Sequence, residues 1–168
     1  AGCPNDCVFC NQKRISGSLL PASAETVRAA VSVLEPGSGY ELAFYGGSFT
    51  GLPLELQEEL LALTDALLAE GFIGSVRLST RPDYIDEERL QLLQCHGVRL
   101  VELGVQSLDD RVLAAAERGH TAAQVAPAVA LLKRFGFQVG LQLMVGMPQQ
   151  SFASVQETVR KAIEMHPD

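Results

Sequence analysis

Short apolar runs alternate with longer helical patterns along this chain, and no other feature limits its possible folds so strongly. Four runs have the length and residue types of β-strands, namely 41–45, 75–79, 99–105 and 138–145. Helical spacing of apolar residues predicts helices over 23–35, 53–70, 86–96, 108–117, 121–135 and 151–166. Because parallel strands need crossover helices between them, the alternation predicts an α/β fold with a parallel sheet.

The predicted strands are nearly continuous in apolar residues, which is typical of a parallel sheet covered on both faces. Periodicity alone does not separate an open doubly wound sheet from a full or partial βα barrel. The chain starts two residues before its first cysteine and stops directly after a predicted helix. We therefore expect one domain over 1–168 that lacks the first strand and one or more final βα units of a longer parent.

Composition narrows the class of protein. The chain has 168 residues, of which 47% are hydrophobic and 20% charged, enough for one globular core. No apolar run approaches the ~18 residues of a membrane span, and no signal peptide is readable at the start, so a cytoplasmic protein is expected. The net charge of −7 argues against a broad nucleic-acid-binding surface on this segment.

Three of the four cysteines lie close together, with the spacing Cys3-x3-Cys7-x2-Cys10 and Phe9 directly before the third. Three thiolates on one short loop can hold three irons of a cubane iron–sulfur cluster, and the fourth iron then stays open. An open coordination position is what metal chemistry requires, in contrast to a saturated structural site. The loop therefore predicts a reactive iron–sulfur centre.

Two other interpretations of the cysteines remain. The first is a zinc site completed by a distant ligand such as Cys95 or His96, for which the three-cysteine spacing is unusual. The second is a set of buried structural cysteines, which the polar residues 4–6 disfavour. Cys95 itself, at a predicted helix end, is expected to be simply buried.

The cysteine spacing with its preceding aromatic resembles the signature of the radical S-adenosylmethionine (SAM) superfamily. That resemblance implies a full or partial parallel βα barrel, with Cys3, Cys7 and Cys10 on a [4Fe–4S] cluster and Phe9 beside the cofactor. It also implies that SAM chelates the open iron through its amino and carboxylate groups.

Further segments carry the resemblance along the chain. Residues 77–86 and 101–121 resemble the elongator catalytic subunit family and, more distantly, oxygen-independent coproporphyrinogen oxidases. The resemblance implies that Gln106 binds the SAM ribose and that Arg118 reaches the SAM carboxylate. An amide offers the ribose both a donor and an acceptor, and a guanidinium can bind a carboxylate through two hydrogen bonds. Taken alone, Gln106 would be a polar strand end, Arg118 a helix-terminal charge and His120 a turn residue.

The strand-end turn Gly46-Gly47-Ser48 occupies the place of a Gly-Gly-Glu-like turn that binds the SAM amino group in the superfamily. Ser48 replaces the acid, so the contact would depend on backbone atoms.

Two other polar positions depart from the relatives. Ser79 stands where both relatives commonly carry Glu, and Gln142 where the oxidase has an acidic residue. Val145, in the turn that follows, completes the set of residues expected at the cofactor.

The resemblance implies an enzyme that cleaves SAM reductively to a 5′-deoxyadenosyl radical, with a flavodoxin- or ferredoxin-like electron donor. The substrate is unknown, and tRNA is one candidate. A non-catalytic iron–sulfur electron carrier or redox sensor is the alternative from another class, and a fragment that assembles no cluster is a third. Lys13, Arg14 and Arg81 are expected to be solvated surface charges, with substrate contact as the other possibility.

Overall fold

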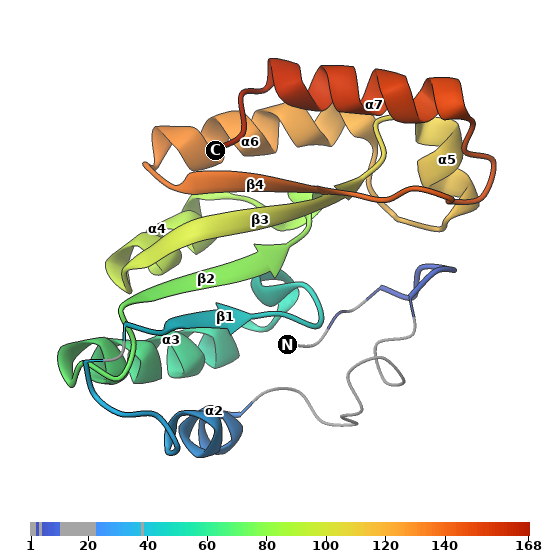
Figure 1. Ribbon diagram of the computed structural model, residues 1–168. Helices are drawn as coiled ribbons and strands as arrows, with labels where there is room; N and C mark the ends of the chain where they lie inside the picture. The colour runs from blue at the N-terminus through green and yellow to red at the C-terminus, as the bar shows by residue number, and fades with distance from the viewer. Residues whose placement is uncertain (1–2, 4, 11–22, 38) are drawn as a thin grey trace.

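The computed structural model describes residues 3, 5–10, 23–37 and 39–168, and a four-stranded parallel sheet is at its centre (Figure 1). The strands follow chain order across the sheet, as β1 (Glu41–Phe44), β2 (Ser75–Thr80), β3 (Val98–Gln106) and β4 (Gln138–Leu143). All three neighbouring pairs are parallel. The predicted α/β class and all four predicted strands are confirmed.

Helices connect the strands, as the alternation predicts. They are α2 (Ala24–Val31), α3 (Leu54–Ala69), α4 (Glu87–Cys95), α5 (Asp110–Ala115), α6 (Val125–Arg134) and α7 (Phe152–Glu164). Short 3-10 turns are η1 (Phe49–Gly51), η2 (Pro82–Tyr84) and η3 (Ala122–Gln124).

Side chains at the helix starts explain where several helices begin. Asp86 accepts a hydrogen bond from the Arg89 amide, and Ser151 accepts one from the Ser154 amide, so both are N-caps. The helix expected over 121–135 begins instead as the 3-10 turn η3, in which the Gln124 amide donates to the Thr121 carbonyl and Gln124 Oε1 accepts from the Thr121 amide. The first helix ends at Val31, four residues earlier than predicted.

The two faces of the sheet differ in chemistry. Buried apolar side chains such as Leu78, Val101 and Val139 occupy one face and join the main core with the helices. Arg77, Glu102 and other polar residues alternate with them, point to the opposite face and are only partly buried. The expectation of strands that are apolar on both faces is therefore wrong for the described residues, because this second face lines a cavity.

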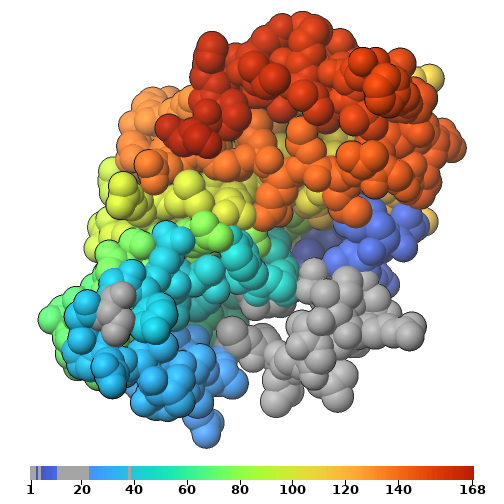
Figure 2. Space-filling view, in the orientation of Figure 1, coloured from blue at the N-terminus to red at the C-terminus, as the bar shows by residue number. Residues whose placement is uncertain are grey.

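The cysteine loop lies beyond the carboxyl ends of the strands, near α5 (Figure 1). The Val8 amide donates to the Ala116 carbonyl at 3.1 Å, and Phe9 packs on a small cluster of Val112, Ala116 and Met147. In Figure 2 the loop residues, in blue, lie against the orange segment that follows β4. Among the described residues, no helix is both long and apolar enough to cross a bilayer.

Candidate functional site

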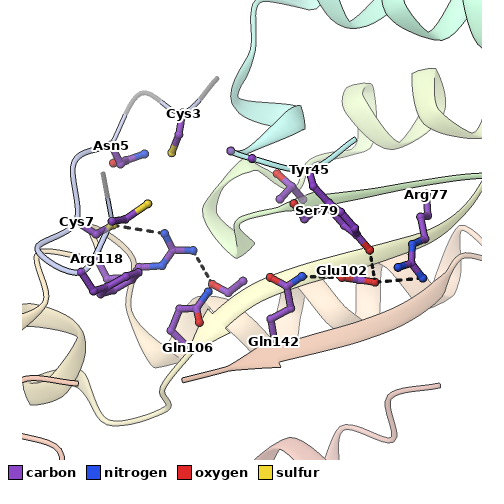
Figure 3. Close-up of a pocket in the computed structure, with 16 residues that line it drawn as sticks. Cys3, Asn5, Cys7, Tyr45, Arg77, Ser79, Glu102, Gln106, Arg118 and Gln142 are labelled. Carbon is purple, nitrogen blue, oxygen red and sulfur yellow. Dashed lines mark hydrogen bonds and ion pairs between the residues drawn. The ribbon is translucent and has the colours of Figure 1, made fainter. Parts of the chain in front are cut away.

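A cavity of about 430 Å³ opens where the cysteine loop meets the polar face of the sheet. All but two of the residues expected at the cofactor line it. Those that line it are Cys3, Cys7, Phe9, Cys10, Gly46, Gly47, Ser79, Gln106, Arg118 and Gln142. Figure 3 shows the cysteines and Arg118 at one end, here called the cysteine end, and Tyr45, Arg77, Glu102 and Gln142 at the other, here called the glutamate end.

Thiol groups and a buried guanidinium make up the cysteine end. Cys7 is buried, Cys3 and Cys10 are half-buried, and none of the cysteines is in a disulfide. Arg118 is only 6% exposed; its Nη1 donates to Cys7 Sγ at 3.5 Å and its Nη2 to the Gly104 carbonyl at 2.7 Å (Figure 3). This contact ties the guanidinium directly to one of the three cysteines expected to bind the cluster.

Gly104 makes room for both predicted SAM-binding side chains. A Cβ at this position would lie 2.8 Å from Arg118 Nη2 and 3.0 Å from Gln106 Nε2, so the ends of these side chains would have to move from their positions at the cavity. Gln106 has a φ of 66°, and the register of β3 with β4 shifts at this point. Such an irregularity re-aims a side chain at a strand end, and here the Gln106 amide lines the cavity.

The turn after β1 brings backbone rather than a side chain to the cavity. Gly46, with a φ of 79°, adopts a conformation that favours glycine, and both Gly46 and Gly47 line the cavity. Ser48 does not line it. The Ser48 hydroxyl is buried 2.9 Å from Thr80 Oγ1, in a hydroxyl cluster behind the turn.

Of the two other residues expected at the cofactor, Ser79 lines the cavity and Val145 does not. Ser79 lies on the polar face of β2 and lines the cavity, as expected. Val145 is 78% exposed in the turn after β4 and does not line the cavity.

The glutamate end is a connected set of hydrogen bonds and ion pairs. Tyr45 Oη donates to Glu102 Oε1 at 2.8 Å, and Gln142 Nε2 donates to Glu102 Oε2 at 2.6 Å (Figure 3). Arg77 pairs with Glu41 at 3.2 Å and approaches Glu102 at 3.7 Å. Burial raises the pKa of Tyr45, and its hydrogen bond to Glu102 adds to that rise.

Of this set, the sequence pointed to Gln142 and not to Tyr45, Arg77 or Glu102. The signal was present, because a charged residue inside an otherwise apolar strand is unusual unless its side chain is paired. Arg77 and Glu102 each stand at such a position in β2 and β3.

Arg81 lies behind the cysteine loop, and its assignment to the solvated surface is wrong. The side chain is 2% exposed and forms a forked ion pair with Asp83, with Nε–Oδ1 and Nη2–Oδ2 both at 2.8 Å. His120 lies in a bend after α5, as a turn residue would, and its side chain is buried there. Lys13 and Arg14 lie outside the described residues.

His120 is held neutral at ordinary pH. Burial, together with the charge of Arg118, lowers the pKa of His120 to about 4. Within the described residues neither ring nitrogen makes a hydrogen bond of ordinary geometry, although a backbone group of Val105 lies near enough to affect its pKa.

Cys95 and His96 lie at the opposite edge of the sheet from the cysteine loop. They stand at the end of α4 just before β3 begins, and the nine residues of β3 separate that edge from the cysteine end of the cavity by roughly 25 Å. Cys95 is exposed, which corrects the expectation that it is buried, and His96 Nδ1 lies 2.7 Å from Asp65. This separation disfavours a zinc site shared with the loop.

The cysteine end suits a [4Fe–4S] cluster that keeps one iron open. In the described residues no three His, Cys, Asp or Glu side chains are gathered as a preformed metal site. The three loop thiols nevertheless border one cavity, and its described lining offers no fourth Cys or His. Buried N–H groups of Arg81 and Arg118 without described partners lie nearby, as an anionic group would require.

Comparison with known proteins agrees with this chemistry. The family model of the radical SAM superfamily matches residues 1–162. The tRNA uridine(34) acetyltransferase of Methanocaldococcus infernus is 31% identical over 162 residues, which cover 84% of this chain and 30% of that protein. The expected resemblance is thus confirmed.

Solved structures agree on the fold. The archaeal Methanocaldococcus infernus Elp3 with an N-terminal deletion has a TM-score of 0.67 at 26% identity, over 82% of this chain and 36% of that one. Coproporphyrinogen III oxidase from Escherichia coli, a radical SAM enzyme, has a TM-score of 0.71 at 22% identity, over 100% of this chain and 41% of that one. The chain therefore spans about a third of the length of the relatives it matches.

Proposed function

The chain belongs to the radical SAM superfamily, and on that basis we propose that Cys3, Cys7 and Cys10 hold a [4Fe–4S] cluster for the reductive cleavage of SAM. The observation that carries the proposal is that all three thiols border the same cavity as Gln106 and Arg118. Residues far apart in sequence thus converge on one site with the donors that both groups need.

The bound cluster would supply one electron that breaks a carbon–sulfur bond of SAM, giving methionine and a 5′-deoxyadenosyl radical. The residues of the chain bind and orient. Arg118 offers a cationic fork to the methionine carboxylate, and its bond to the Gly104 carbonyl fixes the direction of that fork. Gln106 offers one donor and one acceptor to the ribose.

Other groups complete the binding site in this proposal. Gly46 and Gly47 bring backbone C=O groups, which accept hydrogen bonds, to the SAM ammonium, and Ser79 adds a neutral hydroxyl. Phe9, packed on the cluster of Val112, Ala116 and Met147, shields the loop side of the cavity from water. Ser48 takes no direct part, because its hydroxyl is buried behind the turn.

We propose RNA as the class of substrate. The relative from Methanocaldococcus infernus is a tRNA uridine(34) acetyltransferase, which supports RNA modification as the wider role. The net charge of −7 does not favour RNA binding by this segment, so we place the main RNA contacts outside it. A cytoplasmic location and a flavodoxin- or ferredoxin-like reductant belong to the same proposal.

The direct test is product formation. The chain is reconstituted anaerobically with iron and sulfide, then given dithionite and SAM, and 5′-deoxyadenosine is measured. We expect product from the parent chain and from Cys95→Ala, a matched control because Cys95 is exposed and remote, and none from Cys7→Ala. A loaded cluster that makes no product in any variant would favour an electron carrier instead, and a folded chain without iron would contradict the cluster itself.

A further inference from the structure

An ion pair between a buried arginine and a partly buried aspartate adjoins the cysteine loop, and neither residue lines the cavity. Arg81 and Asp83 form it through two parallel hydrogen bonds of 2.8 Å, at the start of η2. The Arg81 guanidinium also lies over the Tyr84 ring, 5.6 Å from its centroid. A buried arginine requires such compensation, because its unpaired charge would be costly to remove from water.

Direct contacts tie this pair to the loop. Asn5 Nδ2 donates to Tyr84 Oη at 3.2 Å. A Cβ on Gly119 would lie 3.0 Å from Arg81 Nη2 and 3.3 Å from Asn5 Oδ1, so these two side chains lie on either side of the same bare backbone. Asn5 is two residues from both Cys3 and Cys7, and the guanidinium therefore lies beside the ligand-bearing segment.

One N–H donor group of Arg81 remains available to an anion. Its Nη1 is buried and has no hydrogen-bond partner within the described residues. Burial alone would lower the pKa of Arg81. The hydrogen bond and charge of Asp83, followed by the charges of Cys7 and Cys3, outweigh burial, so the pKa of Arg81 is raised. His120, neutral at ordinary pH, adds no charge here.

We propose that the buried Arg81–Asp83 pair sets the reduction potential of the cluster held by Cys3, Cys7 and Cys10. The inference rests on the proposed function, since it requires that cluster. Reduction adds one negative charge, and a fixed cation in a water-poor environment stabilises the reduced form, while a nearby carboxylate opposes it. Arg81 is then a positioning and tuning residue that never touches SAM, and Asp83 limits its effect.

The two charges predict shifts of opposite sign, which general damage to the fold would not produce. Each variant is loaded anaerobically, its iron content is measured, and it is titrated with dithionite through mediators while the electron paramagnetic resonance (EPR) signal of the reduced cluster is followed. In Arg81→Gln the ratio of reduced to oxidised cluster at the parent midpoint should fall about tenfold, a shift of about 59 mV to lower potential. Asp83→Asn, which keeps the shape of the carboxylate, should shift the potential upward.

Two further variants make the test specific. The double variant Arg81→Gln with Asp83→Asn should lie between the two single variants. Arg134→Gln removes an exposed arginine that pairs with Glu87 on α4, away from the loop, and should leave the potential unchanged. This control accounts for the change in net charge alone.

Several results would overturn the inference. A potential that is the same in all variants, or that falls in both single variants, contradicts tuning by the pair. If Arg81→Gln fails to load iron, the upward shift in Asp83→Asn still decides the matter. A parent chain that folds and binds no cluster contradicts the proposed function, whereas a loaded cluster with unresponsive potential contradicts this inference only.

Discussion

The two ends of the cavity satisfy their polar groups in different ways. At the glutamate end both carboxylate oxygens of Glu102 accept hydrogen bonds, from Tyr45 and Gln142, and Arg77 lies between two carboxylates. At the cysteine end the reverse holds. There Arg118 Nε is buried without a partner in the described part of the chain, and in the segments that adjoin the cysteine loop the same holds for Arg81 Nη1 and both ring nitrogens of His120.

This difference separates a scaffold from a binding site. A fully connected polar network is rigid and is stable without a ligand, while buried donors left open are costly unless something occupies them. We infer that the glutamate end holds the sheet in shape and orients Gln142, and that the cysteine end provides most of the binding energy for anionic groups. Substitutions at the two ends should then affect different measurements.

The largest effect is expected for Arg118→Gln. Loss of a buried cationic fork should weaken SAM binding to the reconstituted chain about 100-fold or more. Isothermal titration under anaerobic conditions measures it. Arg111→Gln is the matched control, because Arg111 lies on the adjacent α5 with its side chain 82% exposed. Equal losses of affinity in the two variants would remove the special role of the cysteine end.

Gly104→Ala should have the next largest effect. The new methyl group would lie 2.8 Å from Arg118 Nη2, and the guanidinium must move away from the Gly104 carbonyl. SAM affinity should fall about tenfold, in line with the cost of overpacking. At Gly74 an added Cβ meets only ordinary contacts of 3.5 Å and above, so Gly74→Ala should bind SAM normally. Normal binding by Gly104→Ala would show that Arg118 is not held by this contact.

Glu102→Gln tests the scaffold end. It keeps the shape of the side chain and removes the charge that assists the bonds from Tyr45 and Gln142 and pairs with Arg77. The free energy of unfolding in urea should fall by about 1 kcal/mol, with a smaller change in SAM affinity than in Arg118→Gln. Glu58→Gln, on the exposed side of α3, provides the comparison. A larger loss of affinity than of stability would reverse the assignment of the two ends.

His120 should give the smallest effect, seen as a pH dependence. Its pKa is about 4 in the folded chain, through burial and the charge of Arg118, with Arg81 acting in the same direction and Asp83 against it. The unfolded chain binds a proton near pH 6.5, so lower pH favours unfolding. Between pH 7 and 6 this histidine should reduce the free energy of unfolding by about 0.7 kcal/mol.

His120→Gln should remove that part of the pH dependence, measured as the difference in urea unfolding between the two pH values. A variant with the same dependence as the parent chain would mean that His120 is already protonated or solvated in the folded state.

Sequence alone could predict the cysteine end because its residues form contiguous motifs. Cys3, Cys7 and Cys10 lie within one loop, and Gln106 and Arg118 follow a strand end in a recognisable segment. Their convergence on one cavity followed from the parallel sheet, since the carboxyl ends of parallel strands share one edge.

The grouping of residues at the glutamate end could not be predicted from contiguous motifs. Tyr45 directly follows β1, while Arg77, Glu102 and Gln142 lie on β2, β3 and β4, and only the register of the sheet brings them together. Ser48 shows a related limit, because its place in a familiar turn did not reveal that its hydroxyl points to Thr80. For Arg81, a charge beside a proline gave no sign that Asp83 would pair with it in the interior.

The most direct test of the central claim is the EPR spectrum of the reduced, reconstituted chain with and without SAM. If the cysteine end holds a cluster with an open iron that SAM occupies, adding SAM should change the spectrum of the parent chain and change it much less in Arg118→Gln. A fully loaded cluster whose spectrum stays the same at saturating SAM would contradict the account.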